Sequence, residues 1–462
     1  MSSSISHLLQ SRGGENFSLH EQYLNAQMVK VLKTIGYDRV YTKAKGQYLF
    51  DDQGTRYLDL LSGFGVFAVG RNHPTVVSAL GEVLQAELPD MVQMDVSLLS
   101  GLLAEKILSL SPPQLDRMFF CNSGAEAVEA AIKFCRYTTG RSNIVHCDHS
   151  FHGLTVGALS LMGEEIFRQG FGPLVPGCNA VPFNDLDALD KALSRRDVAA
   201  FFVEPIQGKG VNLPDDNYLA EASRICAKYG TLFVIDEIQT GIGRTGKFWA
   251  IDHWDIEPDM ILMAKALSGG FVPIGAVAMK HFIMDKVFNR MDRAVVHGST
   301  FSKNNMAMAA GLATIQVIED EKLLENAAIL GDEIIQSLRA MIDRYEFLKE
   351  VRGKGLMIAV EFGAPQSFSL KAAWSLMETA NKGLFCQMVT IPLFSEHHIL
   401  TQVAGHGMNV VKLLAPMIIN NSDKDNIINA FDTVISDCHK VPGSIWDLGK
   451  TLAGHALKNN KT

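Results

Sequence analysis

Short apolar runs alternate with longer amphipathic stretches between about residues 115 and 280 of the chain. The amphipathic stretches carry apolar residues at helical spacing, as at positions 128, 131, 132 and 135. This alternation predicts an α/β domain with a mostly parallel central sheet, whose ligands bind at the carboxyl ends of the strands. The runs interpreted as strands are RMFFC, NIVHCD, AAFFVEP, TLFVIDE, MILMA and IGAVAM.

The two ends of the chain carry a different pattern. GQYLFDDQGTRYLDLLSG predicts a small antiparallel element with turns at residues 51–52 and 53–54. Beyond residue 330, the strand-like runs LMIAVEF and NVVKLL mix with helical stretches at about 368–383 and 423–437, which predicts a separate α+β lobe. We therefore expect three parts, which are an N-terminal segment over 1–75 that joins the small domain, a large domain over 76–330 and a C-terminal small domain over 331–462.

Composition and charge narrow the classes of function. Hydrophobic residues make up 47% and charged residues 20% of the 462 positions, which is typical of globular proteins. The formal net charge of −8 gives no electrostatic basis for binding nucleic acid or an anionic membrane, so small molecules are the expected partners. The first residues lack the apolar core of a signal peptide, and we expect a cytoplasmic protein. Seven scattered cysteines without a CxxC pair indicate neither a disulfide framework nor a zinc cluster.

A lysine interrupts the apolar stretch MILMAKALSGGFVPIGAVAM, residues 260–279. A buried ammonium group loses its hydration, so Lys265 either reaches solvent or has a use for its amine. An apolar, glycine-lined pocket lowers the pKa of an amine because it penalises the charged form, and a neutral lysine can attack a carbonyl to form a Schiff base. Lys265 is therefore a candidate catalytic residue.

A second candidate lies in CNSGAEAVEAAIKFCRYTTG, where a predicted strand ends and a helix begins. Ser123 to Glu126 fit a capping box at the start of that helix. Gly124 and Ala125 would leave free N–H groups and little bulk, so a phosphate can rest on the positive end of the helix. By itself the pattern is equally typical of a well-capped structural helix.

Three further loops carry polar or aromatic candidates. Asp236 ends the strand of TLFVIDE, with Gln239 a turn later, and a protonated pyridine nitrogen would be a suitable partner for that carboxylate. Phe151 and His152 follow the strand NIVHCD, where an aromatic ring can stack on a flat ligand. The loop HGSTFSKNN offers Thr300 as a donor. Each of these residues alone is as typical of a core or turn position.

Together and in this order, NSGAEAVEAAIKFCR, FHGLT, VEPIQGKG, VIDEIQTGIGRTG, AKALSGG and GSTF resemble the class III aminotransferases, the ornithine- and ω-amino-acid-type enzymes of pyridoxal 5′-phosphate (PLP) fold type I. The resemblance runs from DLLSGFGVFAVGRNHP, near residue 59, to about residue 420. It implies an α/β fold with a large domain and a smaller α+β domain formed by both termini. It also implies PLP as cofactor and transfer of an amino group between an amino donor and an aldehyde, ketone or 2-oxo acid acceptor.

The resemblance implies a role for each candidate residue. Lys265 would form the Schiff base with PLP and shuttle the proton, Asp236 would keep the pyridine nitrogen protonated, and Gln239 would hydrogen-bond the phenolic oxygen of the ring. Thr300 would reach the phosphate of the neighbouring subunit, which implies a homodimer with shared active sites, alone or as a dimer of dimers. The other implied cofactor contacts are Ser123, Gly124 and Ala125 for the phosphate, Phe151 and His152 for the ring, and Glu204 in the supporting hydrogen-bond network.

Two positions depart from the ornithine-type pattern. Those enzymes carry an arginine that clamps a substrate carboxylate where NVVKLLAPM has Lys412, and an acidic residue that gates this arginine where QGKG has Lys209. Lysine lacks the planar fork of arginine, so carboxylate recognition should be weaker or absent. We hypothesise that one substrate lacks an α-carboxylate, with Lys412 at the substrate site and Phe64 of SGFGVF in an aromatic wall.

The sequence supports none of three other kinds of site. GIGRTG, residues 241–246, matches a dinucleotide-binding fingerprint, but the KFWAIDHWDIEPD that follows has no helical period, so we reject NAD binding. His397, His398 and His406 lack an acidic ligand pattern, so no metal site is predicted. A GxSxG nucleophile elbow is absent from the sequence.

Two alternatives to an aminotransferase share its scaffold. A decarboxylase or an aminomutase would use the same cofactor, because the pocket decides which bond breaks. A PLP-binding module without catalytic activity is disfavoured, because Lys265, Asp236 and the phosphate cradle are all present.

Overall fold

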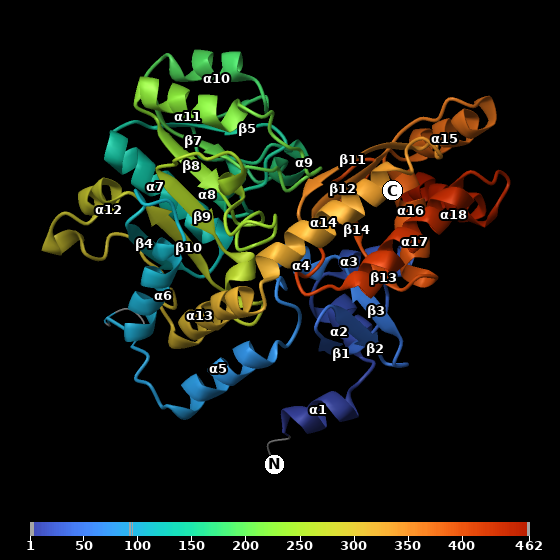
Figure 1. The fold of residues 1–462 in the computed structure, drawn as a ribbon, viewed down its shortest axis with the longest axis horizontal. Helices are drawn as coiled ribbons and strands as arrows, with labels where there is room; N and C mark the ends of the chain where they lie inside the picture. Colours follow the sequence, from blue (N-terminus) through green and yellow to red (C-terminus); the bar gives the residue numbers. More distant parts are fainter. Residues whose placement is uncertain (1–3, 92–93, 95, 460–462) are drawn as a thin grey trace.

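The computed structural model describes residues 4–91, 94 and 96–459. Its centre is a seven-stranded sheet in the order β4-β10-β9-β8-β7-β5-β6 (Figure 1). β10 is antiparallel to both of its neighbours and the other pairs run parallel, so the predicted mostly parallel sheet is confirmed. The strands are β4 (Arg117–Cys121), β5 (Asn143–Cys147), β6 (Cys178–Val181), β7 (Val198–Val203), β8 (Leu232–Asp236), β9 (Met260–Met263) and β10 (Gly275–Met279). β6 was not predicted because its sequence, CNAV, is too short and polar to stand out.

The inner strands are buried on both faces because helices cover both sides of the sheet (Figure 1). Alternate residues enter two different cores, so Phe201 and Phe233 pack on one side while Phe202 and Val234 pack on the other. The helices around this sheet are α5 (Pro74–Gln85), α6 (Leu98–Ser109), α7 (Gly124–Thr139), α8 (Val156–Leu159), α9 (Glu165–Arg168), α10 (Leu186–Leu193), α11 (Tyr218–Tyr229), α12 (His281–Val287) and α13 (Asn305–Asp320), with short 3-10 turns η1 (Ala250–His253), η2 (Lys265–Ser268) and η3 (Met291–Arg293).

Both ends of the chain contribute to a smaller lobe, seen on the right of Figure 1. The predicted N-terminal antiparallel element is formed by β1 (Tyr41–Lys45), β2 (Tyr48–Asp51) and β3 (Arg56–Asp59), and β3 pairs in parallel with β13 (Ile399–Leu400). A second antiparallel sheet has the order β11-β12-β15-β14. Its strands are β11 (Leu348–Lys354), β12 (Met357–Phe362), β14 (Gln402–Val403) and β15 (Val410–Leu413).

The remaining helices complete this lobe and its junction with the large part. Helix α14 (Leu323–Arg339) runs between the two parts (Figure 1) and packs on β11. The others are α1 (Ile5–Ser11), α2 (Asn16–Tyr23), α3 (Ala26–Thr34), α4 (Ser62–Gly65), α15 (Phe368–Ala380), α16 (Leu384–Ser395), α17 (Asn421–Cys438) and α18 (Ser444–Asn459). The predicted lobe formed by both termini is thus present, while the domain boundaries at 75 and 330 stay predictions.

None of the helices in the described ranges is both long and apolar enough to cross a membrane. All seven cysteines are free, and Cys178 is the least buried of them.

Candidate active site

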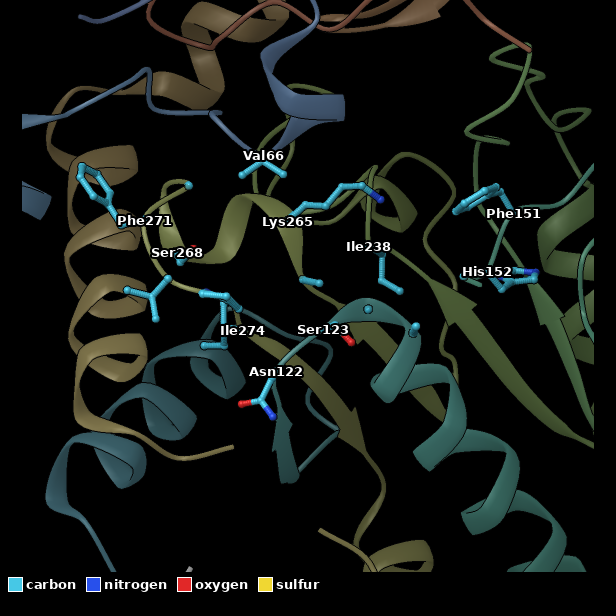
Figure 2. A pocket seen from close by; sticks show the side chains of 17 residues that line it. Val66, Asn122, Ser123, Phe151, His152, Ile238, Lys265, Ser268, Phe271 and Ile274 are labelled. Atoms are coloured by element: carbon cyan, nitrogen blue, oxygen red, sulfur yellow. The ribbon is translucent and has the colours of Figure 1, made fainter. Parts of the chain in front are cut away.

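A cavity of about 470 Å³ opens at one edge of the central sheet (Figure 2). Its walls follow the carboxyl ends of β4, β5, β8 and β9 and precede the amino end of the antiparallel β10, which lies at the same edge. This is the edge where the sequence predicts a ligand. The lining residues are Val66, Asn122, Ser123, Gly124, Ala125, Phe151, His152, Gly153, Ile238, Ala264, Lys265, Ser268, Gly270, Phe271, Val272, Pro273 and Ile274.

Lys265 is the first residue of η2, and one residue, Ala264, separates it from the end of β9. Its side chain extends into the cavity above Ile238 (Figure 2), and it is half-buried in this setting. Burial lowers the pKa of its amine, while the charges of Asp236 and Glu204 act in the opposite direction. The amine is thus shifted toward the neutral form that a Schiff-base lysine needs.

Asp236 stands at the end of β8 and is 3% exposed. One carboxylate oxygen accepts the N–H of Ile238 at 3.0 Å, and the other lies 2.6 Å from Nδ1 of His152. Burial alone would lower the pKa of His152, but its hydrogen bond to Asp236 and the charge of that carboxylate outweigh burial and raise the pKa. The sequence identified both residues, and only the structure pairs them.

The start of α7 forms another wall of the cavity. Ser123 caps the helix, since its hydroxyl accepts the N–H of Glu126 at 3.1 Å. The reciprocal bond of the predicted capping box is displaced by one residue, because the Glu126 carboxylate accepts the N–H of Asn122 at 2.6 Å. The N–H groups of Gly124 and Ala125 belong to the first turn, where a helix offers no acceptor of its own, so they can bind an anion in the cavity.

Glu204 follows β7 and lies behind the cavity wall. Its two carboxylate oxygens accept the N–H groups of Phe151 at 2.9 Å and Gly208 at 2.7 Å. Burial raises the pKa of Glu204, and the charge of His152 opposes that rise. Glu204 thus positions two backbone segments, one of which carries the ring of Phe151 into the cavity (Figure 2).

Gln239 and Lys412 meet beside the cavity rather than within its lining. The amine of Lys412, on β15, donates to the carbonyl of Gly208 at 2.5 Å and to Oε1 of Gln239 at 2.9 Å. Nε2 of Gln239 donates to the carbonyl of Phe64 at 3.0 Å. Burial, followed by the charge of Lys265, lowers the pKa of Lys412 to about 7.

Two predicted contacts lie outside the cavity of this chain. The ring of Phe64 is 55% exposed, and from the same segment Val66 lines the cavity. Thr300 is exposed in the turn between η3 and α13, next to Ser299, whose hydroxyl accepts a hydrogen bond from Asn122 at 2.5 Å. The role of Thr300 in a neighbouring subunit stays a prediction.

Sequence reasoning missed most of the apolar wall. Val66, Ile238, Phe271 and Ile274 come from three separate segments, and each also suits an ordinary core position. The one available signal was the FVPIG run before β10, because an antiparallel strand brings its amino end to the ligand edge.

The residues around the cavity fit PLP. A lysine amine enters the space, a buried carboxylate lies close enough to influence it, and a helix start offers N–H groups to a phosphate. The volume lies in the range of small-molecule sites.

A family model described as aminotransferase class-III matches residues 33–435. The chain belongs to this family. Its activity is therefore that of a class III aminotransferase, with PLP as cofactor.

Several known proteins resemble this class III aminotransferase. The aminotransferase PigE of Serratia sp. (strain ATCC 39006) is 35% identical over 450 residues, which cover 90% of this chain and 53% of PigE, so the chain spans about half the length of that relative. Ornithine aminotransferase from Toxoplasma gondii ME49 superposes with a TM-score of 0.78 at 29% identity, covering 92% of this chain and 98% of that one. A PLP-bound amine transaminase from an uncultivated Pseudomonas species gives a TM-score of 0.75 at 26% identity, covering 87% and 95%.

Proposed function

We propose that this class III aminotransferase takes at least one substrate without a carboxylate beside the reacting carbon, such as an apolar aldehyde or a terminal amine. The proposal rests on the hydrogen bonds that Lys412 already makes within the protein. From its sequence context, Lys412 corresponds to the arginine that binds the substrate carboxylate in ornithine-type enzymes. Lys412 is 3% exposed, and its amine donates hydrogen bonds to Gly208 and Gln239. A substrate carboxylate would have to displace both bonds to reach it.

Lys209, the other lysine that departs from the ornithine-type pattern, also has partners within the protein. The amine of Lys209 forms an ion pair with Glu164 and lies 4.0 Å from the ring centroid of Phe167. Phe167 in turn meets Phe151 edge to face, with their centroids 5.9 Å apart. These contacts give both lysines partners within the protein and set an aromatic surface beside the cavity, which supports an apolar substrate.

The proposed roles of the other residues follow from their positions. PLP, when bound, supplies an electron sink for the reacting carbon. Nζ of Lys265, which lines the cavity, would accept the proton from that carbon and deliver it to the cofactor carbon that takes up the amino group. The Asp236 carboxylate, oriented by His152, holds a proton on the ring nitrogen. The first-turn N–H groups of Gly124 and Ala125 bind the phosphate.

We also propose that the enzyme acts as a homodimer with shared sites. Apolar side chains are exposed at the start of α6 and shortly before α13, including Val96 at 96%, Leu98 at 75% and Phe301 at 62%. Helices α5, α6 and α13 lie side by side there (Figure 1). Large exposed apolar groups beside Thr300 support its placement at an interface with a second copy.

A comparison of amino acceptors tests the substrate proposal. With one amino donor held in excess, kcat/KM is measured for a straight-chain alkyl aldehyde and for a 2-oxo acid of the same length. We expect the aldehyde to be preferred by about tenfold or more, because the oxo acid must bury its carboxylate without a free cationic partner. A preference for the oxo acid would refute the proposal while leaving the family activity intact.

A further inference from the structure

Three residues from distant parts of the chain meet around the side chain of Gln239. Phe64 comes from the N-terminal segment, Gly208 and Gln239 from loops of the large part, and Lys412 from the C-terminal lobe. The contacts form one continuous chain, in which the amine of Lys412 bridges Gly208 and Gln239, and the amide of Gln239 continues to Phe64.

These contacts define the orientation of the Gln239 amide. The amide atom that faces Lys412 is the oxygen, which accepts a hydrogen bond from the lysine amine whether that amine is charged or neutral. The carbonyl of Phe64 has no donor, so the atom that faces it must be the NH2 group. That NH2 group has a second hydrogen, which is left for a further acceptor.

We propose that Lys412 is a positioning residue that locks Gln239 with its NH2 group available to the phenolic oxygen of PLP, rather than a residue that binds substrate. The inference rests on the proposed placement of Gln239 beside that oxygen. It does not depend on which substrate the enzyme accepts.

The surroundings of Lys412 support a structural use of its amine. Both hydrogen-bond acceptors are neutral oxygens, so the amine is held by geometry more than by an opposing carboxylate. A Cβ at Gly208 would lie 2.9 Å from Oε1 of Gln239 and 3.0 Å from a carboxylate oxygen of Glu204, so these side-chain ends pack closely against the backbone of Gly208. A larger residue at this position would displace the end of the Gln239 side chain.

The charges around Lys412 make it a poor trap for a substrate anion. The positive charges of Lys265, Arg244 and Lys209 and the negative charge of Glu204 all act on it. Burial and these cations lower its pKa to about 7, so a large fraction of the amine is neutral near that pH. A neutral amine still donates to Gln239 and Gly208, whereas it holds a carboxylate only weakly.

The test uses the holoenzyme without any substrate. The pH midpoint of the visible absorption band of the bound cofactor is measured for the parent protein, Lys412→Met, Gln239→Met and the double variant. A donor on the phenolic oxygen and a nearby positive charge both disfavour protonation of the adjacent imine. We therefore expect Lys412→Met and Gln239→Met each to raise the midpoint, by about one pH unit.

The double variant distinguishes an effect of Lys412 through the orientation of Gln239 from a direct effect of its charge. If Lys412 acts through Gln239, its substitution changes the midpoint little once Gln239 is already methionine. An equal shift in both backgrounds, or no shift with Lys412→Met in the parent, would refute the proposal that Lys412 positions Gln239. No shift with Gln239→Met would instead refute the proposed placement of Gln239.

Lys209→Met serves as the matched control. It removes a comparably buried amine, which pairs with Glu164 and not with Gln239. We expect its midpoint shift to be less than half that of Lys412→Met, and an equal shift would assign the effect to charge alone. Methionine is an apolar chain of similar length to lysine, and the thermal midpoint of each variant verifies that the fold is retained.

Discussion

At the scale of single residues, Lys265 holds a backbone conformation that lysine rarely adopts. Its φ is 38°, in the left-handed region, at the junction of β9 and η2. Such a conformation costs about 1–3 kcal/mol and persists only when the surrounding structure imposes it. Here the turn aims the side chain into the cavity instead of along the strand (Figure 2).

Lys265→Ala should therefore remove both the covalent cofactor linkage and the catalytic proton carrier. We expect kcat to fall by at least about 10²–10⁴-fold, and borohydride treatment to fix no cofactor on the protein. Both are measured, by steady-state kinetics and by the mass of the borohydride-treated chain. A variant that kept full turnover and a reducible yellow colour would contradict the assignment.

The pair formed by His152 and Asp236 makes a prediction about stability. His152→Gln leaves the buried carboxylate of Asp236 without its cationic neighbour, which should cost about 3–5 kcal/mol. Urea denaturation of the PLP-free protein measures this loss. Adding Asp236→Asn to the variant should recover part of it, because the unpaired charge is then removed.

The pH dependence of that pair follows from the raised pKa of His152. The folded state holds the proton more tightly than the unfolded chain, so the stabilisation is complete below the ordinary histidine pKa of about 6.5. It is lost as the pH rises through the higher folded value. The difference in stability between the parent and His152→Gln should shrink as the pH is raised, and a difference that grows would contradict the pairing.

At the scale of elements, the start of α7 depends on its contact with the turn after β8. A Cβ at Gly124 would lie 2.9 Å from Cδ1 of Ile238 and 3.0 Å from its Cγ2. The glycine that the sequence assigned to phosphate binding is thus also demanded by packing. The helix can approach Ile238 closely only because this residue has no side chain.

Gly124→Ala should destabilise the protein by about 1–3 kcal/mol through overpacking against Ile238. Adding Ile238→Ala should relieve the overlap and restore PLP affinity, because the alanine N–H remains able to bind the phosphate. Thermal denaturation and PLP titration of the apo-protein measure both effects, with Ile238→Ala alone as the control. PLP affinity that stays low in the double variant would show that the added methyl group obstructs the cofactor itself.

At the scale of the whole molecule, the motif GIGRTG joins the lobes through the side chain of Arg244. Arg244 is 1% exposed, and its guanidinium donates to the carbonyls of Ala415, in the C-terminal lobe, and Gly65, in the N-terminal segment. The first element after the motif is the short 3-10 turn η1, and not an α-helix. One buried arginine thus ties three parts of the chain together beside the cavity.

Shared active sites in a homodimer predict complementation between two damaged subunits. Thr300→Ala should weaken PLP binding in its own dimer, and Lys265→Ala should abolish turnover in its own. The two variants are mixed, partially denatured and refolded together, so that hybrid dimers form. The mixture should regain activity at limiting PLP, because one site of each hybrid then has both Lys265 and Thr300 intact. Light scattering verifies the dimer, and no recovery from verified hybrids would contradict a shared site.

The sequence by itself determined the kind of fold, and it pointed to the residues that we propose for the reactive centre. Strands buried on both faces, such as β7 and β8, have continuous apolar runs that are visible without coordinates. Lys265 and Asp236 stand out because charged groups at the ends of such runs are costly to bury without a purpose. These signals depend only on neighbouring residues, so they can be recognised in the sequence without knowledge of the fold.

Tertiary structure alone decided which partner each polar group has. The amine of Lys412, whose contact with substrate stays a prediction, donates to Gln239 and Gly208, which lie more than 170 positions away along the chain. The same holds for the pairing of His152 with Asp236 across 84 positions. Hydrogen bonds form between groups that folding brings within about 3 Å, and no periodicity in the sequence encodes distances between separate segments.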